Sequence, residues 1–370
     1  MHRIFAVCPP GLEQVLSREM GAPASSGGVE VEGDLLRAAR LNLTLRTATR
    51  VLARLGEFRA TTFADLIRKA RALPFDLCLR KGEPVALRVT CRKSRLYHSG
   101  AVAERLREAI GARLGADPPE ATADEEADAP AQLILARFDH DVCTVSADTS
   151  GALLHRRGYR LAQFRAPLRE TLAAAMLLAA GYDGSVPLAD PLCGSGTIAI
   201  EAALIARRRA PGIARAFTLE RWPGFDATVL ARLRNEARAR ELARAPHSIL
   251  ASDADPAAVR GARENAERAG VATDLGIEDR ALREVRVGPG PGLLATNPPY
   301  GVRVTADLTR LYSDLGDLAR RSGFRLAVLT ATRAAAAAGR LRLETAFRTQ
   351  NGGIPVELLI GCGLGAAAER

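Results

Sequence analysis

The sequence lacks the residue patterns of metal sites and disulfide frameworks. Its six cysteines include no pair at C-x-x-C spacing, and its five histidines show no H-x-x-x-H spacing. Zinc sites and small disulfide-bonded domains depend on such patterns. We therefore expect reduced cysteines, no metal cofactor and no disulfide-linked fold.

Long apolar segments are also missing. The longest apolar run, residues 171–181, is shorter than the roughly 20 residues that a helix needs to span a bilayer. Residues 1–11 have neither a long apolar stretch nor the cleavage signature of a secretory signal. We expect a cytoplasmic protein with no membrane partner.

Lysine is scarce, although the chain is strongly basic. Only three of the 52 basic residues are lysines, and the net charge is +10. A bias towards Arg can reflect a GC-rich genome, so the layout of the charges is more informative than their sum. Residues 80–113 hold nine Lys or Arg against three acids, residues 155–169 hold five Arg and no acid, and residues 117–128 hold six acids and no base. Such separate patches favour a nucleic acid partner.

The first 150 residues mix strand-like and helix-like segments in an α+β pattern. The pattern predicts two small units that divide near residue 60, with an exposed acidic loop at 117–130 in the second. Strands are expected at 3–7, 28–31, 50–58, 84–91, 132–138 and 142–147, and helices at 11–20, 35–41, 63–73 and 96–114.

Regular alternation of strand and helix begins at about residue 155. It predicts a doubly wound parallel sheet whose ligand lies at the carboxyl ends of the strands. An Arg-rich insertion at 210–247 interrupts the alternation and could contact RNA or a cofactor. Strands are expected at 186–190, 248–253, 274–277, 292–296, 325–330, 341–349 and 356–362, and helices at 167–180, 196–209, 226–243, 256–269 and 306–321.

A glycine-rich motif, DPLCGSGT at 190–197, joins a predicted strand to a predicted helix. Because Gly194 and Gly196 have no Cβ, the loop can turn sharply and let a ligand approach the backbone. With Ala199 the motif also fits the dinucleotide pattern G-x-G-x-x-A, so a nicotinamide oxidoreductase is a rival interpretation. Its spacing is unfavourable, because the next strand ends at Asp253, 57 residues beyond Gly196, whereas the dinucleotide fold has its acid about 20 residues after the glycines.

Acidic residues follow the next two predicted strands. We favour Asp253 as the residue that binds both hydroxyls of a ribose, and Asp255 as the N-cap of the helix that begins at Pro256. Asp279 follows the next strand and could accept a hydrogen bond from an adenine amino group, although an acid in a loop is usually solvated.

A second motif, Asn-Pro-Pro-Tyr-Gly at 297–301, follows a short apolar strand. Its two prolines fix the backbone and have no N–H groups. The Asn297 side-chain oxygen and the adjacent carbonyl then form a rigid pair of acceptors, which suits a planar exocyclic amine. Tyr300 offers a flat face on which a base can stack.

Together these motifs resemble those of the S-adenosylmethionine-dependent RNA guanine-N2 methyltransferases that carry an N-terminal THUMP domain. HRRGYR (155–160) and APLRETLAAAML (166–177) match segments that precede the catalytic motifs in that family, and CRKSRLYHSGAVAERLREAIG (91–111) resembles the second half of a THUMP domain. The resemblance covers nearly the whole chain. It is closest to the methyltransferase half of the bacterial 23S rRNA enzyme, and the related tRNA enzymes share the same plan.

The resemblance implies a Rossmann-like methyltransferase sheet at 153–370, a ferredoxin-like domain at 1–60 and a THUMP RNA-binding domain at 61–152. It also implies S-adenosylmethionine as the cofactor. Catalysis is expected from Asn297, Pro298 and Tyr300, and Glu201 is expected to support the cofactor loop. The cofactor residues implied are Glu170, Thr171, Asp190, Cys193, Gly194, Ser195, Gly196, Asp253, Asp279 and Asn297.

The expected RNA contacts lie in the two basic segments: Lys93, Arg95, Tyr97, His98, Arg156, Arg157 and Arg160. Three other functions stay open. An N-P-P-Y motif also suits a DNA adenine-N6 or protein glutamine methyltransferase, the glycine loop suits a nicotinamide enzyme, and the basic half suits a non-catalytic RNA-binding factor. The sequence does not fix which RNA is modified or the oligomeric state.

Overall fold

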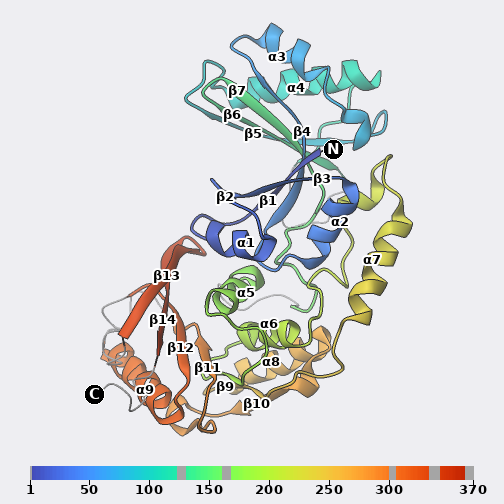
Figure 1. The fold of residues 1–370 in the computed structure, drawn as a ribbon. Coiled ribbons are helices and arrows are strands. Elements are labelled where there is room, and N and C mark those ends of the chain that lie inside the picture. Colours follow the sequence, from blue (N-terminus) through green and yellow to red (C-terminus); the bar gives the residue numbers. More distant parts are fainter. Residues whose placement is uncertain (1, 123–130, 161–167, 300–305, 333–341, 363–370) are drawn as a thin grey trace.

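The computed structural model describes residues 2–122, 131–160, 168–299, 306–332 and 342–362. Two seven-stranded sheets dominate it, and Figure 1 shows them one above the other. The expected mixed α/β fold with a Rossmann-like sheet is confirmed. None of the described helices is both long and apolar enough to cross a membrane.

The first sheet has the strand order β2-β3-β1-β4-β7-β6-β5. Its long strand β4 pairs with β1 on one side and with β7 on the other. The sheet therefore continues through the predicted boundary at residue 60, which falls just after β4. The strands are β1 (His2–Val7), β2 (Ala24–Ser25), β3 (Gly28–Gly33), β4 (Arg50–Arg59), β5 (Val85–Arg92), β6 (Gln132–Asp139) and β7 (Val142–Asp148).

Among the described residues, helix α4 packs on one face of the half of this sheet that contains β5, β6 and β7. Val102 and Leu106 of α4 belong to the same buried core as Ile134 and Phe138 of β6, so the alternate residues of the strands, among them Arg88 on β5, lie on the other, open face. The helices of this half of the chain are α1 (Glu13–Met20), α2 (Leu35–Thr44), α3 (Phe63–Ala70) and α4 (Ser99–Leu114), with the short turn η1 (Phe75–Leu77).

The second sheet has the order β10-β9-β8-β11-β12-β14-β13. Its first five strands are parallel, as predicted, but β14 runs antiparallel to both neighbours. The predicted parallel sheet therefore holds for these five strands, and β14 departs from it because the two residues between β13 and β14 permit a hairpin and not a crossover. The strands are β8 (Leu188–Asp190), β9 (Ile249–Asp253), β10 (Leu275–Asp279), β11 (Leu293–Thr296), β12 (Arg325–Thr330), β13 (Arg342–Asn351) and β14 (Ile354–Cys362).

Helix α6 lies at the centre of the molecule, and every one of its residues is buried. Its sequence is almost entirely apolar, as expected of a helix that is covered on all sides. The helices of this half are α5 (Glu170–Ala179), α6 (Thr197–Ala206), α7 (Ala227–Ala239), α8 (Pro256–Ala269) and α9 (Ala306–Ser322), with the short turns η2 (Thr218–Arg221), η3 (Ala272–Asp274) and η4 (Leu282–Glu284).

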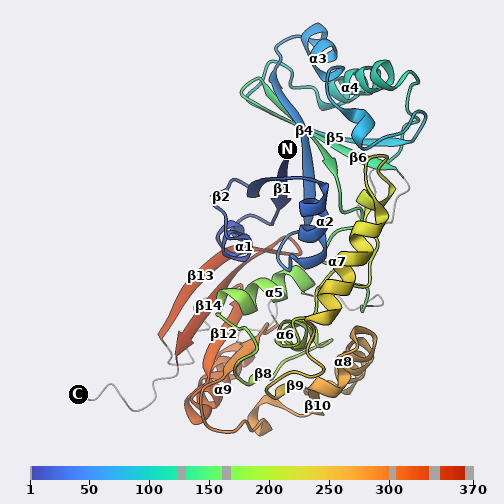
Figure 2. The same cartoon turned by 45° about the vertical axis from the view of Figure 1, so that its right-hand side comes forward.

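The insertion at 210–247 connects the two halves of the molecule. Its helix α7 packs on α2, and Figure 2 shows it running along one side from the lower sheet towards the upper one. The buried Trp222 donates its indole N–H to Gln132 Oε1 of β6 at 2.8 Å, and Arg80 donates to the Arg221 carbonyl at 2.9 Å. The sequence left open whether the insertion contacts RNA or a cofactor. The contacts described for it in the structure are with other parts of the protein.

Other polar contacts join the unit of the first sheet to the unit of the second sheet. The half-buried Arg46, just after α2, donates to the carbonyls of Leu204 and Arg209 at the end of α6, at 3.2 and 2.7 Å. Elsewhere Gly11 lies against β13 so closely that a Cβ there would be 1.7 Å from the Arg348 carbonyl oxygen. The two halves therefore have a fixed relative position.

We predict that Trp222→Phe lowers the free energy of unfolding by about 2 kcal/mol, because Gln132 Oε1 is left buried without its donor. Urea unfolding followed by fluorescence or circular dichroism measures this change. Tyr97→Phe, at a side chain that is 79% exposed, is the control and should change stability by less than about 0.5 kcal/mol. Equal stabilities for Trp222→Phe and the wild type would show that this contact does not hold the halves together.

Candidate active site

The motifs found in the sequence meet at one edge of the second sheet. Strands β8, β9, β10 and β11 are parallel, and the register pairs Asp190 with Ala251 and Asp279 with Asp253. The carboxyl ends of parallel strands lie on the same edge. Asp190, Asp253, Asp279 and Asn297 therefore share this edge, as the sequence predicted.

The buried Asp190 ties two of these strand ends together. Its carboxyl accepts a hydrogen bond from the Thr296 hydroxyl at 2.8 Å and from the Leu192 N–H at 3.3 Å. Burial is the main cause that raises the pKa of Asp190 to about 7, and the nearby Asp253 carboxylate adds to the shift. Asp190 therefore fixes the start of the glycine loop relative to the residue just before Asn297.

Asp253 holds the glycine loop from the neighbouring strand. Its Oδ2 accepts the Gly194 N–H at 2.8 Å, and its Oδ1 accepts the Asp255 N–H at 3.0 Å. The loop needs glycine at Gly196, where φ is +82° and a Cβ would lie 3.0 Å from Ala262. This places bare backbone beside a half-buried carboxylate, which is an arrangement that suits a nucleoside ligand.

The other residues around the loop have contacts within the protein, and the predicted cofactor contacts of Cys193 and Ser195 stay predictions. Asp255 caps α8 by accepting the Ala257 N–H at 2.9 Å, which confirms the N-cap prediction. Ser195 contributes its carbonyl to Asn265 Nδ2 at 3.0 Å. Burial raises the pKa of the Cys193 thiol well above its usual range, so this thiol is not a nucleophile. Asp279 is exposed at the end of β10, and its predicted adenine contact stays a prediction.

Asn297 presents an unused acceptor at this edge. Its side-chain oxygen is buried and has no hydrogen-bond partner among the described residues. Such an orphaned oxygen costs about 1–3 kcal/mol, which is offset when a ligand donates to it. Pro298 beside it is buried. Tyr300 lies outside the described residues, so its stacking role stays a prediction.

Two arginines of the HRRGYR segment, Arg157 and Arg160, belong to an ionic network within the protein. Arg157 donates to the carbonyls of Leu154 and Arg46, and its Nε lies 3.6 Å from Glu201. Arg160 donates to the Leu168 carbonyl and the Thr197 hydroxyl, and its Nε lies 3.5 Å from Glu170. Arg157 is 6% exposed and its described partners are protein groups, which contradicts its predicted phosphate contact, whereas that of the half-buried Arg160 stays a prediction.

The same network reaches Thr197, the last residue of the glycine-rich motif, through Arg160. The fully buried Glu201 of α6 accepts the Tyr159 hydroxyl at 3.1 Å, and its predicted support of the cofactor loop stays a prediction. Glu170 and Thr171 are also buried, and one oxygen of Glu170 has no partner among the described residues. Burial raises the pKa of Glu170, although Arg160 opposes the shift. Their contact with the cofactor stays a prediction.

The remaining RNA candidates are exposed. Lys93, Arg95, Tyr97 and His98 follow β5, and His98 also caps α4 through its Nδ1, which accepts the Ala101 N–H at 3.2 Å. Arg156 is exposed next to the buried network. All five side chains can reach solvent, and their contact with RNA stays a prediction.

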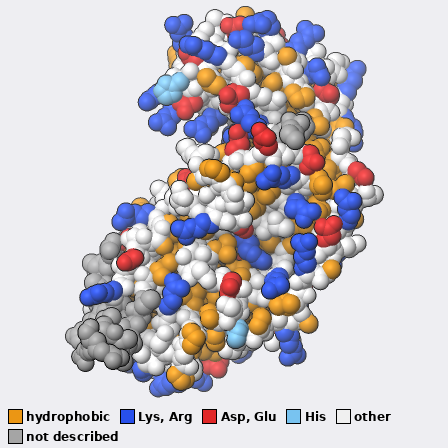
Figure 3. Space-filling view, in the orientation of Figure 1, with side chains coloured by type: hydrophobic (Ala, Val, Ile, Leu, Met, Phe, Trp, Pro, Cys, Tyr) orange, Lys and Arg blue, Asp and Glu red, His pale blue; other side chains and the backbone are white. Residues whose placement is uncertain are grey.

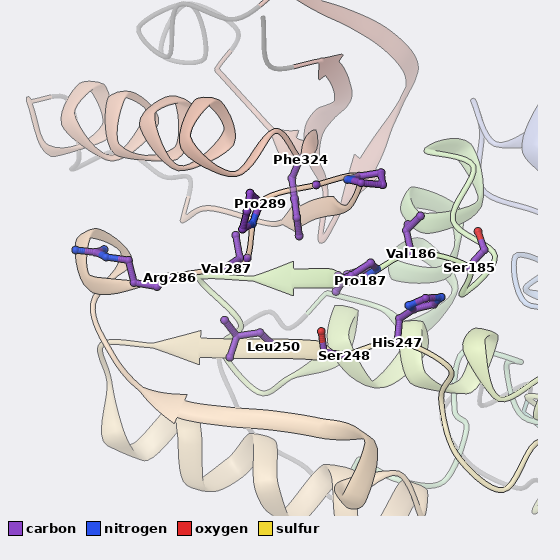
Figure 4. A pocket seen from close by; sticks show the side chains of 14 residues that line it. Ser185, Val186, Pro187, His247, Ser248, Leu250, Arg286, Val287, Pro289 and Phe324 are labelled. Carbon is purple, nitrogen blue, oxygen red and sulfur yellow. The ribbon is translucent and has the colours of Figure 1, made fainter. Parts of the chain in front are cut away.

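A separate pocket of about 490 Å³ lies at the opposite edge of the sheet. Figure 4 shows its lining, which comes from residues at or before the beginnings of β8, β9, β11 and β12, including Pro187, His247, Pro289 and Phe324. Among the described residues no group of three His, Cys, Asp or Glu could hold a metal ion.

Comparison with known proteins assigns this arrangement to a family. Residues 157–357 match the family model described as RMKL-like, methyltransferase domain, and residues 3–52 match the RlmL ferredoxin-like domain. The chain belongs to the RMKL-like methyltransferase family. This confirms the predicted family and decides between the methyltransferase and the nicotinamide enzyme, in favour of the former. Residues 61–152 lie outside both matches, so the THUMP assignment and the domain limits stay predictions.

Individual relatives extend the match to nearly the whole chain. The ribosomal RNA large subunit methyltransferase K/L of Syntrophotalea carbinolica is 35% identical over 96% of this chain, which spans only 53% of that protein. A Synechocystis protein that is provisionally named an RNA methyltransferase is 31% identical over 96% of this chain and 95% of its own. The protein SMU.472, solved in complex with SAH, superposes with a TM-score of 0.86 at 29% identity, over 97% of each chain.

The buried carboxyl at the centre of this RMKL-like site predicts an unusual pH dependence. Asp190 keeps its proton up to about pH 7 in the folded chain, whereas an unfolded Asp loses it near pH 4. The folded state therefore binds more protons in this window, and the stability that Asp190 contributes falls as the pH rises from about 4 through 7.

We predict that Asp190→Asn, which keeps the acceptor for Thr296, removes this loss of up to roughly 4 kcal/mol. Urea unfolding of both proteins between pH 4.5 and 8 measures the difference, and comparing the two cancels the titration of all other groups. Parallel stability curves across this range would contradict the assignment.

Proposed function

We propose that the chain transfers a methyl group from S-adenosylmethionine to the exocyclic N2 amine of a guanine in RNA. One observation carries the proposal: the buried Asn297 oxygen without a partner lies on the same sheet edge as the Gly194–Gly196 loop. An acceptor in that position suits an amine that must be held beside the cofactor. The name of the K/L relative supports RNA as the substrate.

The residues present fit the cofactor. Asp253 has a half-buried carboxylate that can accept the two ribose hydroxyls, and Asp279, one strand further along the edge, can accept the adenine amino group. The orphaned oxygen of Glu170 suits the ammonium of the methionine end. When bound, the cofactor supplies an already activated methyl group, so the protein need not supply a nucleophile.

The guanine amine is a poor nucleophile because its lone pair is delocalised into the ring. Hydrogen bonds from its N–H groups to Asn297 Oδ1 and to the Pro298 carbonyl would orient this lone pair and stabilise positive charge on nitrogen. Alignment with the methyl group supplies much of the remaining rate. A paired guanine must first leave its stack, and Tyr300 is the candidate to hold it.

We favour 23S rRNA as the substrate and keep tRNA as the alternative. The K/L relative and the RlmL-type ferredoxin-like domain support the former. A DNA or protein amine would suit the Asn297 site equally well, but the exposed basic residues after β5 and the RNA names of both relatives favour RNA. A non-catalytic binding role is disfavoured by the intact Asn297 and Asp253.

We predict that Asn297→Ala lowers methyl transfer by at least about a hundredfold, because the amine loses its acceptor, and that SAH affinity stays near that of the wild type. Turnover with labelled S-adenosylmethionine and calorimetric titration of SAH measure the two quantities. Asn235→Ala, at an exposed Asn of α7, should change neither. If Asn297→Ala retains turnover within a few-fold of the wild type, Asn297 does not orient the amine.

We predict that reversing two exposed charges, Lys93→Glu with Arg95→Glu, weakens RNA binding and flattens its salt dependence together, since phosphate contacts release counterions. Filter binding at several salt concentrations measures both. The control is Arg321→Glu with Arg325→Glu, two exposed charges at the edge opposite the site. If the first pair behaves like the control, RNA does not contact the segment after β5.

A further inference from the structure

A second cavity, of about 540 Å³, lies where the two sheets and the start of α5 meet. One wall comes from the first sheet, through Arg50 of β4, Arg88 of β5 and Leu135 of β6. The opposite wall comes from Thr349 to Gly353, at the turn between β13 and β14. Pockets that bind small ligands have about 300–1,000 Å³, so the space is large enough for one nucleotide unit.

The charge of this cavity is positive. Arg50, Arg88 and Arg169 line it, and no acidic residue is among its described lining. Asp148 lies behind Arg50 and forms a buried ion pair with it, so that pair is close to neutral. The exposed Arg169, which precedes the first turn of α5, adds a positive charge to the lining, and Arg88 contributes a further guanidinium group to the same wall.

A hydroxyl without a partner lies in the same wall. Thr349 is 8% exposed, and its Oγ1 has no hydrogen-bond partner among the described residues. It can donate to an anionic oxygen. Thr171 and Leu172, in the first turn of the ten-residue helix α5, also line the space, and the positive end of a helix dipole favours an anion there. Cys8 in the lining is not a nucleophile, because burial raises the pKa of its thiol to about 12.

The surroundings confirm that the region is electropositive. The neighbouring His155 is held neutral, with its pKa lowered to about 3, first by burial and then by Arg169, Arg157, Arg156 and Arg160. Burial and the nearby Arg50 likewise lower the pKa of Arg88, against a smaller effect of Asp148. Glu170 in the first turn of α5 pairs with Arg160 and does not line the cavity.

The cavity opens on the catalytic side of the second sheet. Because β14 is antiparallel to both β12 and β13, the end of β13 at Asn351 lies at the same edge as Asp190 and Asn297. Thr171, implied to lie at the methionine end of the cofactor, lines the cavity as well. Figure 3 shows the molecule hollowed between its upper and lower parts, with Lys and Arg side chains bordering the hollow above.

We propose that this cavity binds a backbone phosphate of the substrate RNA next to the target nucleotide, through Arg88, Arg169 and the Thr349 hydroxyl. The inference rests on the proposed RNA methyltransferase function and adds a specific anion subsite to it. The subsite would hold the strand between the open face of the first sheet and the edge that carries Asn297. A flipped guanine would then enter the site from a backbone that is fixed on one side.

The test uses the full chain and large-subunit rRNA purified from a strain that lacks the gene. Arg169→Gln, Arg88→Gln and Thr349→Val are compared with the wild type, and Arg321→Gln, on the far edge at the end of α9, is the matched control. Filter binding gives the RNA Kd and its salt slope, labelled methyl transfer gives KM and kcat, and SAH titration with a thermal melt reports folding. Arg169→Lys tests rescue by charge.

Each glutamine variant should raise the RNA Kd about tenfold and reduce the salt slope by about 0.7–0.9, the value for one lost phosphate contact. KM for RNA should rise more than kcat falls, SAH affinity should stay unchanged, and Arg169→Lys should restore the slope. If Arg169→Gln folds and binds RNA like Arg321→Gln, the phosphate subsite is wrong while the proposed function stands. If the wild type neither binds nor methylates RNA, the proposed function fails and the subsite fails with it.

Discussion

The hydrogen bond between the buried Asp190 carboxyl and the Thr296 hydroxyl is the constraint on which the site depends. It joins the ends of β8 and β11. The glycine loop follows β8, and Asn297 follows β11. Asp253 adds a third strand end by accepting the Gly194 N–H. A half-buried carboxylate, bare loop backbone and an open amide acceptor thus come to one edge through backbone register. Catalysis by alignment requires such preorganisation, because misplacing the amine or the methyl group forfeits the gain from proximity.

Polar contacts between the unit of the first sheet and the unit of the second sheet form a second constraint. Arg46, Arg157 and Trp222 each donate hydrogen bonds across boundaries between units, and they do so from buried or half-buried positions. Removing one partner of such a contact leaves a buried polar group unsatisfied, so these contacts resist hinge motion. The distance between the surfaces of the two units is therefore set by contacts within the protein. The insertion at 210–247 contributes to that rigidity through its contacts with β6 and α2.

The sequence predicted the parts of the site that depend on local chemistry. The glycine loop, Asp253, the Asp255 cap and Asn297 all follow strands whose ends must meet in a parallel sheet, so motif order was sufficient to bring them together. Prediction from the sequence failed where the burial of a side chain determines what it contacts. Arg157 and Arg160 look like a basic surface in a string of letters, yet Arg157 lies beside Glu201, 44 residues further along the chain, and Arg160 lies beside Glu170. The cavity lined by Arg88 and Thr349 left no signal either, since it joins strands about 260 residues apart. The antiparallel direction of β14 follows from the two-residue turn before it, which the alternation of strands and helices does not reveal.

The most direct test of the account is to identify the methylated nucleoside. Large-subunit rRNA, small-subunit rRNA and tRNA from a strain lacking the gene are incubated separately with the purified protein and labelled S-adenosylmethionine, then digested to nucleosides. The account predicts N2-methylguanosine, in large-subunit rRNA first, while its appearance in tRNA alone would keep the chemistry and move the substrate to the alternative. Label in any other nucleoside, or no label in RNA together with no binding of the cofactor, would contradict the central claim that the Asn297 edge methylates the guanine amine.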